Sequence, residues 1–203
     1  AAVDAGGNAV EKVEIPAEWA SIEVKPAAAT VDMSRPEFVR NIVDPINALK
    51  GDDLPVSAFN GREDGTWDNG TAAYEKRGIA VNVPEWNVEN CIQCNQCSYV
   101  CPHAAIRPFL ATEEEAAASG LAWKQGLGET KTYKFRIQVS PLDCTGCGNC
   151  VDVCPSKTKA LVMKPLESQM AEAENWNAVI KNVGYKQVVD KTKTVKNSQF
   201  AQP

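Results

Sequence analysis

Two stretches of the chain alternate apolar and polar residues in the way that favours half-buried β-strands. The first is IAVNV, residues 79–83, in which Ile79, Val81 and Val83 recur at every second position. The second is KTYKFRIQV, with apolar side chains at Tyr133, Phe135, Ile137 and Val139. Because alternate side chains of a strand point to opposite faces, each stretch predicts a strand with one buried face. Both stretches lead toward a run of cysteines.

A different spacing between residues 34 and 51 predicts a helix. Its apolar residues recur every three or four positions, at Phe38, Ile42, Ile46 and Leu49. Ser34 and Glu37 are placed to form a capping box at the start of this helix. Pro45 is expected to kink the helix, since proline has no N–H to donate, and Gly51 is expected to end it.

Two further helices are predicted beyond residue 110. In TEEEAAASGLA, Thr112 can cap a helix, Glu115 occupies the capping-box position and Gly120 lies near the end. A second helical face follows the last cysteine, with apolar residues at Leu166, Met170, Ala173, Trp176 and Ile180. We expect this face to pack against the rest of the molecule.

Together these elements predict an α+β fold. The predicted parts are an extended linker (1–33), a helix with a loop-rich module (34–84), a domain that contains all eight cysteines (85–166), and a C-terminal helix with a linker (167–203).

The charge balance argues against binding to nucleic acids. Acidic residues outnumber basic ones by 26 to 21, and the formal net charge is −5. Nucleic-acid binding depends on lysine and arginine neutralising phosphates, which this composition does not favour. No apolar run approaches the roughly 18 residues that suggest a membrane span. The sequence therefore predicts a soluble protein of the cytoplasm, with no membrane or nucleic-acid partner.

All eight cysteines lie in two copies of one motif. CIQCNQCSYVCP runs from Cys91 to Pro102, and CTGCGNCVDVCP runs from Cys144 to Pro155. Each copy has the form C-x2-C-x2-C-x3-C-P, which is typical of two-cluster ferredoxins, where the fourth cysteine of a run binds the other cluster. The first predicted 4Fe-4S ligand set is Cys91, Cys94, Cys97 and Cys154. The second is Cys144, Cys147, Cys150 and Cys101. The central part at 85–166 is therefore expected to be a bacterial-type domain for two 4Fe-4S clusters, similar to a ferredoxin, with an inserted helix and with the loop-rich module before it.

Two other uses of the cysteines remain open at this point. Zinc usually takes four ligands as two separated pairs, which the closely spaced third and fourth cysteines fit poorly. Disulfides between residues this close are strained and need an oxidising compartment. The only histidine, His103, is expected to pack or form a hydrogen bond, because the cysteines already supply eight ligands. A cluster bound by four thiolates has no open position for a substrate, so it carries electrons.

The stretch PVSAFNGREDGTWDNGTAAYEKRGIAVNVPEW, followed by CIQCNQCSYVCPHAAIRP and later by CTGCGNCVDVCP and KALVMKPL, closely resembles the middle of pyruvate:ferredoxin (flavodoxin) oxidoreductases. The triplet Glu75, Lys76 and Arg77 matches the element for which the EKR region of that family is named. No role for these three side chains follows from the sequence, and a charged loop that braces neighbouring domains is the favoured interpretation.

The resemblance implies a segment of an enzyme that converts pyruvate and coenzyme A to acetyl-CoA and carbon dioxide. Electrons would pass through the two clusters to ferredoxin or flavodoxin. Thiamine diphosphate, Mg²⁺ and a third 4Fe-4S cluster are implied for the whole enzyme, but not for this segment, which would not catalyse the reaction alone. The remaining domains of the oxidoreductase would be its neighbours, and the whole enzyme would be a homodimer.

Two alternative functions are consistent with the same residues. One is a free-standing ferredoxin-like carrier that serves several enzymes. The other is a binding protein built on structural zinc. The long N-terminal region without cysteines argues against the carrier, and the start at AAVDAGGNAV without methionine leads us to expect a piece of a longer polypeptide.

Overall fold

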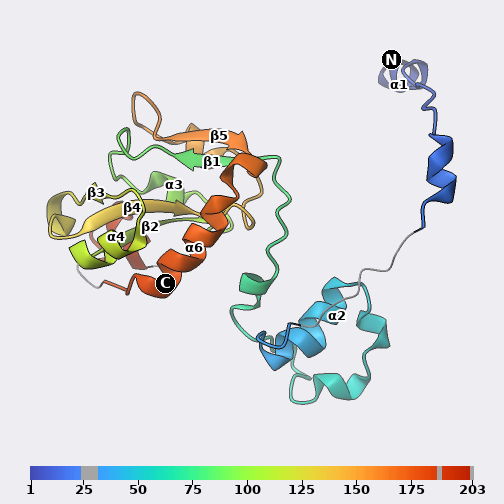
Figure 1. The fold of residues 1–203 in the computed structure, drawn as a ribbon, viewed down its shortest axis with the longest axis horizontal. Coiled ribbons are helices and arrows are strands. Elements are labelled where there is room, and N and C mark those ends of the chain that lie inside the picture. The colour runs from blue at the N-terminus through green and yellow to red at the C-terminus, as the bar shows by residue number, and fades with distance from the viewer. Residues whose placement is uncertain (24–31, 187–188, 202–203) are drawn as a thin grey trace. The chain divides into compact units, whose positions relative to one another are not determined.

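The computed structural model describes residues 1–23, 32–186 and 189–201. The chain forms two compact units, Ala1–Asn69 and Gly70–Pro203 (Figure 1). The division between them falls inside the 34–84 module that the sequence predicts. The predicted linker at 1–33 lies partly outside the described residues, which resume at residue 32.

The described part of the predicted linker contains helical turns. Helix α1 spans Ala2–Asn8, and a 3-10 helix spans Ala17–Ser21. Neither has a buried residue. Asp4 in the first turn of α1 favours a helical turn over the predicted extended chain, because a carboxylate stabilises the N-terminal end of a helix.

The predicted helix after residue 34 contains a wide turn. A π-helix at Val39–Val43 runs directly into α2 at Asp44–Asn47. The buried side chains are Val39, Ile42 and Val43, whereas Leu49 is 95% exposed. The predicted apolar face is therefore wrong at Ile46, which is 37% exposed, and at Leu49, because a π-turn holds more residues than the α-helical spacing assumes. Ile42 is buried, and Phe38 is half-buried with its ring centroid 4.8 Å from that of Trp67.

The predicted ends of this helix also differ from the observed ones. Ser34 does not cap the helix, since its hydroxyl and its N–H both donate to the Asp32 carboxylate, at 2.6 and 2.9 Å. Gly51 does not end it, because α2 stops at Asn47 and Gly51 begins a 3-10 helix that runs to Asp53. A second 3-10 helix spans Val56–Phe59.

Two antiparallel sheets organise the second unit. In the first sheet, β1 (Asn82–Trp86) pairs with β5 (Leu161–Pro165). The second sheet has the order β2-β4-β3, and its strands are β2 (Ile106–Ala111), β4 (Lys134–Val139) and β3 (Lys124–Gln125). The β4 prediction is confirmed, whereas the predicted strand at 79–83 begins three residues later, with Ile79 and Val81 exposed.

The four strands that flank the two cysteine runs pair crosswise, so that each pair joins one run to the other. Strands β1 and β2 precede and follow the first run, and β4 and β5 precede and follow the second. The strand before each run pairs with the strand after the other run, so Trp86 lies opposite Leu161 and Ile106 lies opposite Val139. This pairing brings the end of each run toward the start of the other.

Short helices connect the strands of the second unit. The α-helices are α3 (Gln96–Tyr99), α4 (Glu113–Ser119), α5 (Asn149–Asp152), α6 (Ala171–Asn182) and α7 (Val195–Ser198). The 3-10 helices span Thr71–Tyr74, Gly128–Thr130, Leu166–Gln169 and Gln199–Ala201.

The helix predicted to start after Thr112 is present as α4, with both ends as expected. The Glu115 N–H donates to the Thr112 hydroxyl at 3.2 Å, and the Thr112 N–H donates to the Glu115 carboxylate at 2.8 Å. Gly120 follows the helix in the left-handed conformation. Both capping predictions are confirmed.

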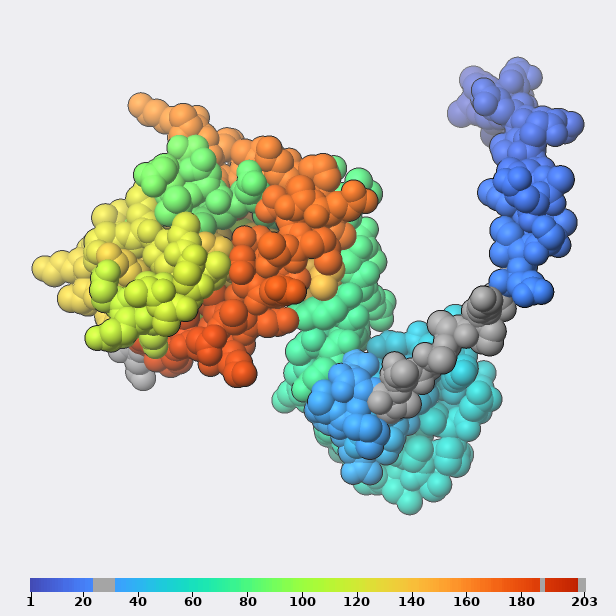
Figure 2. Space-filling model, in the orientation of Figure 1, coloured from blue at the N-terminus to red at the C-terminus, as the bar shows by residue number. Residues whose placement is uncertain are grey.

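The buried face of α6 differs from the predicted one. Trp176, Val179 and Val183 are buried, whereas Ile180 is 47% exposed. Val179 and Val183 pack with Ala116 of α4 and Ala111 of β2. The space-filling view shows α4 in yellow-green beside α6 in orange-red on the surface of the second unit (Figure 2).

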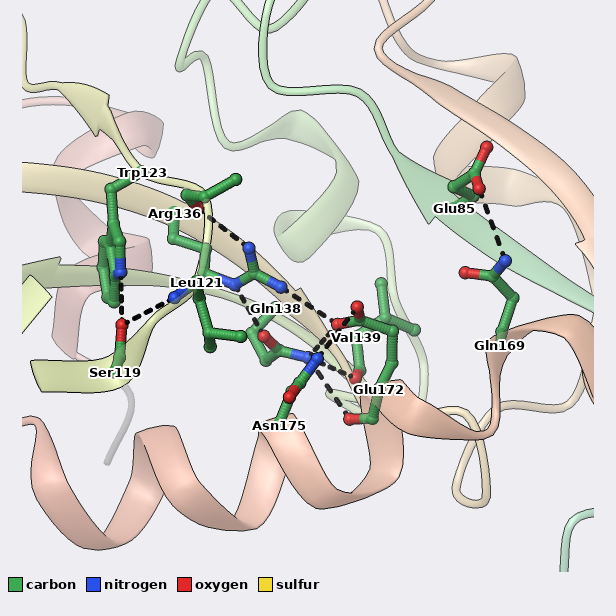
Figure 3. Close-up of polar contacts among 11 residues, drawn as sticks. Glu85, Ser119, Leu121, Trp123, Arg136, Gln138, Val139, Gln169, Glu172 and Asn175 are labelled. Atoms are coloured by element: carbon green, nitrogen blue, oxygen red, sulfur yellow. Dashed lines mark hydrogen bonds and ion pairs between the residues drawn. The ribbon is translucent and has the colours of Figure 1, made fainter. Parts of the chain in front are cut away.

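Strand β4 is buried on both faces. Phe135, Ile137 and Val139 point into the core that contains the cysteines. On the opposite face, Arg136 and Gln138 contact α6 (Figure 3).

A polar network joins β4 to α6. Arg136 pairs with the Glu172 carboxylate at 3.0 Å, and the Gln138 amide donates to the same carboxylate at 2.7 Å. Arg136 also donates to the Gln138 side-chain oxygen at 2.7 Å. Burial lowers the pKa of Arg136, and the charge of Glu172 opposes this effect.

The C-terminal residues, expected to be a linker, are packed onto the first cysteine run. Phe200 is 5% exposed and meets Phe135 edge to face, with 6.2 Å between ring centroids. The Ser98 hydroxyl donates to the Gln199 side chain at 3.0 Å.

Among the described residues, no helix has the length and apolar character that a membrane span requires.

We predict that Glu172→Ala destabilises the second unit, because it leaves the buried Arg136 charge without its partner. The expected loss is about 2–3 kcal/mol, and the melting temperature should fall by roughly 6–12 °C. The control is Glu174→Ala, an exposed position on the same helix, which should change little. Equal melting temperatures for both variants in a calorimetric scan would contradict the prediction.

Candidate metal centre

The cysteines line two separate cavities. One cavity is lined by Cys91, Cys94, Cys97 and Cys154. The other is lined by Cys101, Cys144, Cys147 and Cys150. Each cavity thus holds the first three cysteines of one run and the last cysteine of the other run. These groups coincide with the two ligand sets that the motif predicts.

The two cysteine loops have the same backbone conformation. Gln93 and Gly146, each two residues after the first cysteine of its run, have positive φ values of 60° and 72°. In both loops the N–H of this residue donates to the first cysteine sulfur at 3.4 Å. Asn95 and Gly148 are also left-handed, and each begins the short helix that carries the third cysteine.

The loops reach this conformation in different ways. The second uses glycines, and a Cβ on Gly146 would lie 2.9 Å from the Asn82 carbonyl oxygen. The first uses Gln93 and Asn95, whose positive φ values are costly for residues with a side chain. Buried hydrogen bonds offset that cost, since the Gln93 amide donates to the Gln125 carbonyl at 2.6 Å and the Leu127 N–H donates to Gln93 at 3.1 Å.

The cavity walls disfavour free thiolates. Burial, together with the neighbouring cysteines, raises the pKa of the Cys150 thiol to about 12. Burial and neighbouring cysteines also raise the pKa of Cys97, and burial raises the pKa values of Cys91 and Cys144. Four thiolates in such a space need a cationic partner, and an iron-sulfur core supplies one.

Two lysines stabilise the ends of the cysteine runs. Lys124 donates at 2.8–3.2 Å to the carbonyls of Val88, Glu89 and Cys91. Lys159 donates at 2.9–3.1 Å to the carbonyls of Val151, Asp152 and Cys154. The Ala160 N–H also donates to the Cys154 sulfur at 3.4 Å. Both lysines therefore lie beside cysteines of the first cavity, Cys91 and Cys154, and each cavity has at least one N–H that points to a sulfur.

The EKR triplet contacts the second cysteine loop. Lys76 forms a hydrogen-bonded ion pair with Asp143, the residue directly before Cys144. The Ser140 hydroxyl donates to the same carboxylate at 2.6 Å. Both charged side chains are 27% exposed. Lys76 therefore has a structural role that sequence reasoning did not find, because its partner is distant in the sequence.

The other residues of interest have simpler positions. His103 is exposed and lines the second cavity. Trp86, which the sequence analysis missed, lines the first cavity. Burial raises the pKa of the Cys91 thiol, and the indole N–H of Trp86 opposes part of this rise. The N–H has no hydrogen-bond partner among the protein atoms in the described ranges. None of the eight cysteines forms a disulfide.

The arrangement around each cavity suits a cluster better than a compact ion site. In the part of the chain that the structure describes, no group of three or more histidine, cysteine, aspartate or glutamate side chains is arranged to hold a single metal ion. Thiolates that surround a cluster stand further apart than ligands of one ion, because the cluster lies between them. The cysteine donor set and its N–H groups therefore fit an iron-sulfur cluster.

Comparison with protein families assigns both parts of the chain. Residues 90–158 match a family described as a 4Fe-4S dicluster domain. Residues 25–80 match the EKR family, which is described as a domain of unknown function. The second unit thus has an α+β fold that fits the ferredoxin-like class, and a stretch that matches the EKR family precedes it.

Comparison with curated proteins is more specific. The chain is 55% identical over 207 residues to pyruvate:ferredoxin oxidoreductase of Moorella thermoacetica and 50% identical over 204 residues to pyruvate-flavodoxin oxidoreductase of Enterobacter agglomerans. Both alignments cover 100% of this chain but 17% of the relative. A pyruvate dehydrogenase [NADP(+)] of Cryptosporidium parvum is 47% identical over 185 residues, 86% of this chain and 9% of the relative. In sequence, the chain is the counterpart of one segment of the pyruvate:ferredoxin (flavodoxin) oxidoreductases.

We predict that Lys76→Met weakens the attachment of the second cysteine loop. The Asp143 carboxylate would lose its ion-pair partner while remaining mostly buried, and the nearby charge of Arg107 would compensate only in part, at a cost of about 1–2 kcal/mol. In a fixed urea concentration the metal-loaded protein should therefore unfold up to roughly 5–30 times faster, as followed by its visible absorbance.

The matched control for Lys76→Met is Arg77→Met, the next residue of the triplet, whose side chain is 63% exposed. Its unfolding rate should stay within about twofold of the unmodified protein. If both variants unfold at the same rate, the ion pair between Lys76 and Asp143 does not stabilise the second cysteine loop, and the prediction is contradicted.

Proposed function

We propose that the chain carries two 4Fe-4S clusters and transfers electrons between them. One is held by Cys91, Cys94, Cys97 and Cys154. The other is held by Cys144, Cys147, Cys150 and Cys101. The observation that carries the proposal is the grouping of the cysteines in two cavities, each with three ligands from one run and one from the other. The family description of residues 90–158 as a 4Fe-4S dicluster domain supports it.

The cysteines and apolar residues around the cavities suit electron transfer in which no bond to a substrate forms. Four thiolates leave no open coordination position, and a bound 4Fe-4S cluster would supply a one-electron redox couple. Buried side chains such as Ile137 and Leu161 line the first cavity and limit access of water. The two loops are in contact through α3 and α5, and Cys150 is close enough to Cys97 to contribute to the rise in the pKa of the Cys97 thiol, which burial mainly causes. This contact provides a short path between the two sites.

The segment is proposed to act within a larger oxidoreductase. The whole enzyme would oxidise pyruvate in the presence of coenzyme A to acetyl-CoA and carbon dioxide. Thiamine diphosphate, Mg²⁺ and a third 4Fe-4S cluster would belong to its other domains, and the whole enzyme would be a homodimer. The chain spans about a sixth of the length of the relatives it matches, at 50–55% identity, which supports a role as one internal part.

The final electron acceptor is proposed to be ferredoxin or flavodoxin. Relatives of this segment occur in proteins named for ferredoxin, for flavodoxin and for NADP(+). The same segment therefore accompanies several acceptors, and we infer that residues outside it choose among them.

We further propose that α4 is an insertion in the ferredoxin-like domain. The cytoplasmic location and the boundaries at 33, 84 and 166 stay predictions.

The direct test is iron analysis and electron paramagnetic resonance of the anaerobically prepared protein, before and after reduction with dithionite. We expect about eight irons per chain and two reduced 4Fe-4S signals that interact magnetically. Zinc in place of iron, or a single cluster signal with about four irons, would contradict the proposal. Two clusters that reduce and reoxidise reversibly without any larger assembly would favour the free-standing carrier.

A further inference from the structure

Trp86 places an unpaired donor at the wall of the first cysteine cavity. Its side chain lines this cavity together with Cys91 and Leu161. The indole nitrogen is buried, and it has no hydrogen-bond partner within the described ranges. Leaving a buried N–H without an acceptor costs about 1–3 kcal/mol, so such groups are rare unless a ligand satisfies them.

Neighbouring side chains hold the Trp86 ring at this position. The Arg136 guanidinium carbon lies 5.5 Å from the ring centroid, within the range of a cation–π contact. Phe135 meets the ring edge to face, with 6.5 Å between centroids. Arg136 is itself fixed by Glu172 on α6 (Figure 3). The half-buried ring is therefore held by Arg136 and Phe135, and its nitrogen lies on the buried side.

The second cavity differs in its polar side chains. Those that line it are His103, Thr145 and Asn149, and all three residues are exposed. Water can satisfy their donors, so none of them resembles the buried Trp86 N–H. This asymmetry between two otherwise matching loops points to a property of one cluster rather than of the whole domain.

We propose that Trp86 donates its indole N–H to a sulfur of the cluster held by Cys91, Cys94, Cys97 and Cys154, and thereby raises the reduction potential of that cluster. The inference rests on the proposed function. Reduction adds one electron to the cluster, and a hydrogen-bond donor stabilises the more negative form to a greater extent. Trp86 is thus a tuning residue, whose effect is on an electron-transfer equilibrium rather than on cluster binding.

The test is Trp86→Phe, which removes the N–H and keeps an aromatic ring against Arg136. The two reduction potentials are measured by redox titration followed by electron paramagnetic resonance. The equilibrium constant for reduction should fall about threefold to tenfold for one cluster only, where tenfold corresponds to about 59 mV for one electron. The matched control is Trp123→Phe, whose N–H donates to the Ser119 hydroxyl at 2.8 Å (Figure 3), and it should shift neither potential.

Unchanged potentials in the Trp86→Phe protein, or equal shifts of both clusters, would overturn the inference. Absence of two clusters from the unmodified protein would instead overturn the proposed function. If the variant does not retain its clusters, the unmodified protein with ¹⁵N-indole tryptophan provides a second test by electron–nuclear double resonance. We expect a ¹⁵N coupling to a reduced cluster, and the lack of any such coupling would also overturn the inference.

Discussion

The crossed pairing of four short strands is the constraint on which the rest of the second unit depends. Because β1 pairs with β5 and β2 pairs with β4, the end of each cysteine run is brought to the start of the other. Neither run could assemble four cysteines around its own loop, since its last cysteine belongs to the opposite cavity. Folding and ligand assembly are therefore one event, because the strands that build the core also bring together both sets of thiols.

The chain surrounds these thiols with compensating groups. Burial raises the pKa values of several cysteines, so the free thiolates would be unstable there. Lys124 and Lys159 border the two runs, and Lys76 holds Asp143 at the base of the second loop. The EKR triplet thus contributes through one of its three residues to the position of a cysteine loop.

The sequence predicted the features that depend on residues close together in the chain. The cysteine spacing, the capping box at Thr112 and the alternation in β4 each depend on neighbouring residues, and the sequence was sufficient for them. The π-turn at Val39–Val43 displaced the predicted apolar face, and the buried face of α6 depends on where β2 and α4 lie. The contacts of Lys76 and Trp86 join residues far apart in the chain. A single sequence carries no signal for such pairs, so only the folded structure revealed them.

The ligand crossing can be tested by counting iron in two double variants. Crossing predicts that Cys91→Ala with Cys154→Ala removes two ligands of one cluster and leaves about four irons per chain. It also predicts that Cys144→Ala with Cys154→Ala removes one ligand from each cluster and leaves markedly fewer, with both reduced signals altered. The reverse result, one intact cluster in the Cys144/Cys154 variant and damage to both in the Cys91/Cys154 variant, would show that each run binds its own cluster.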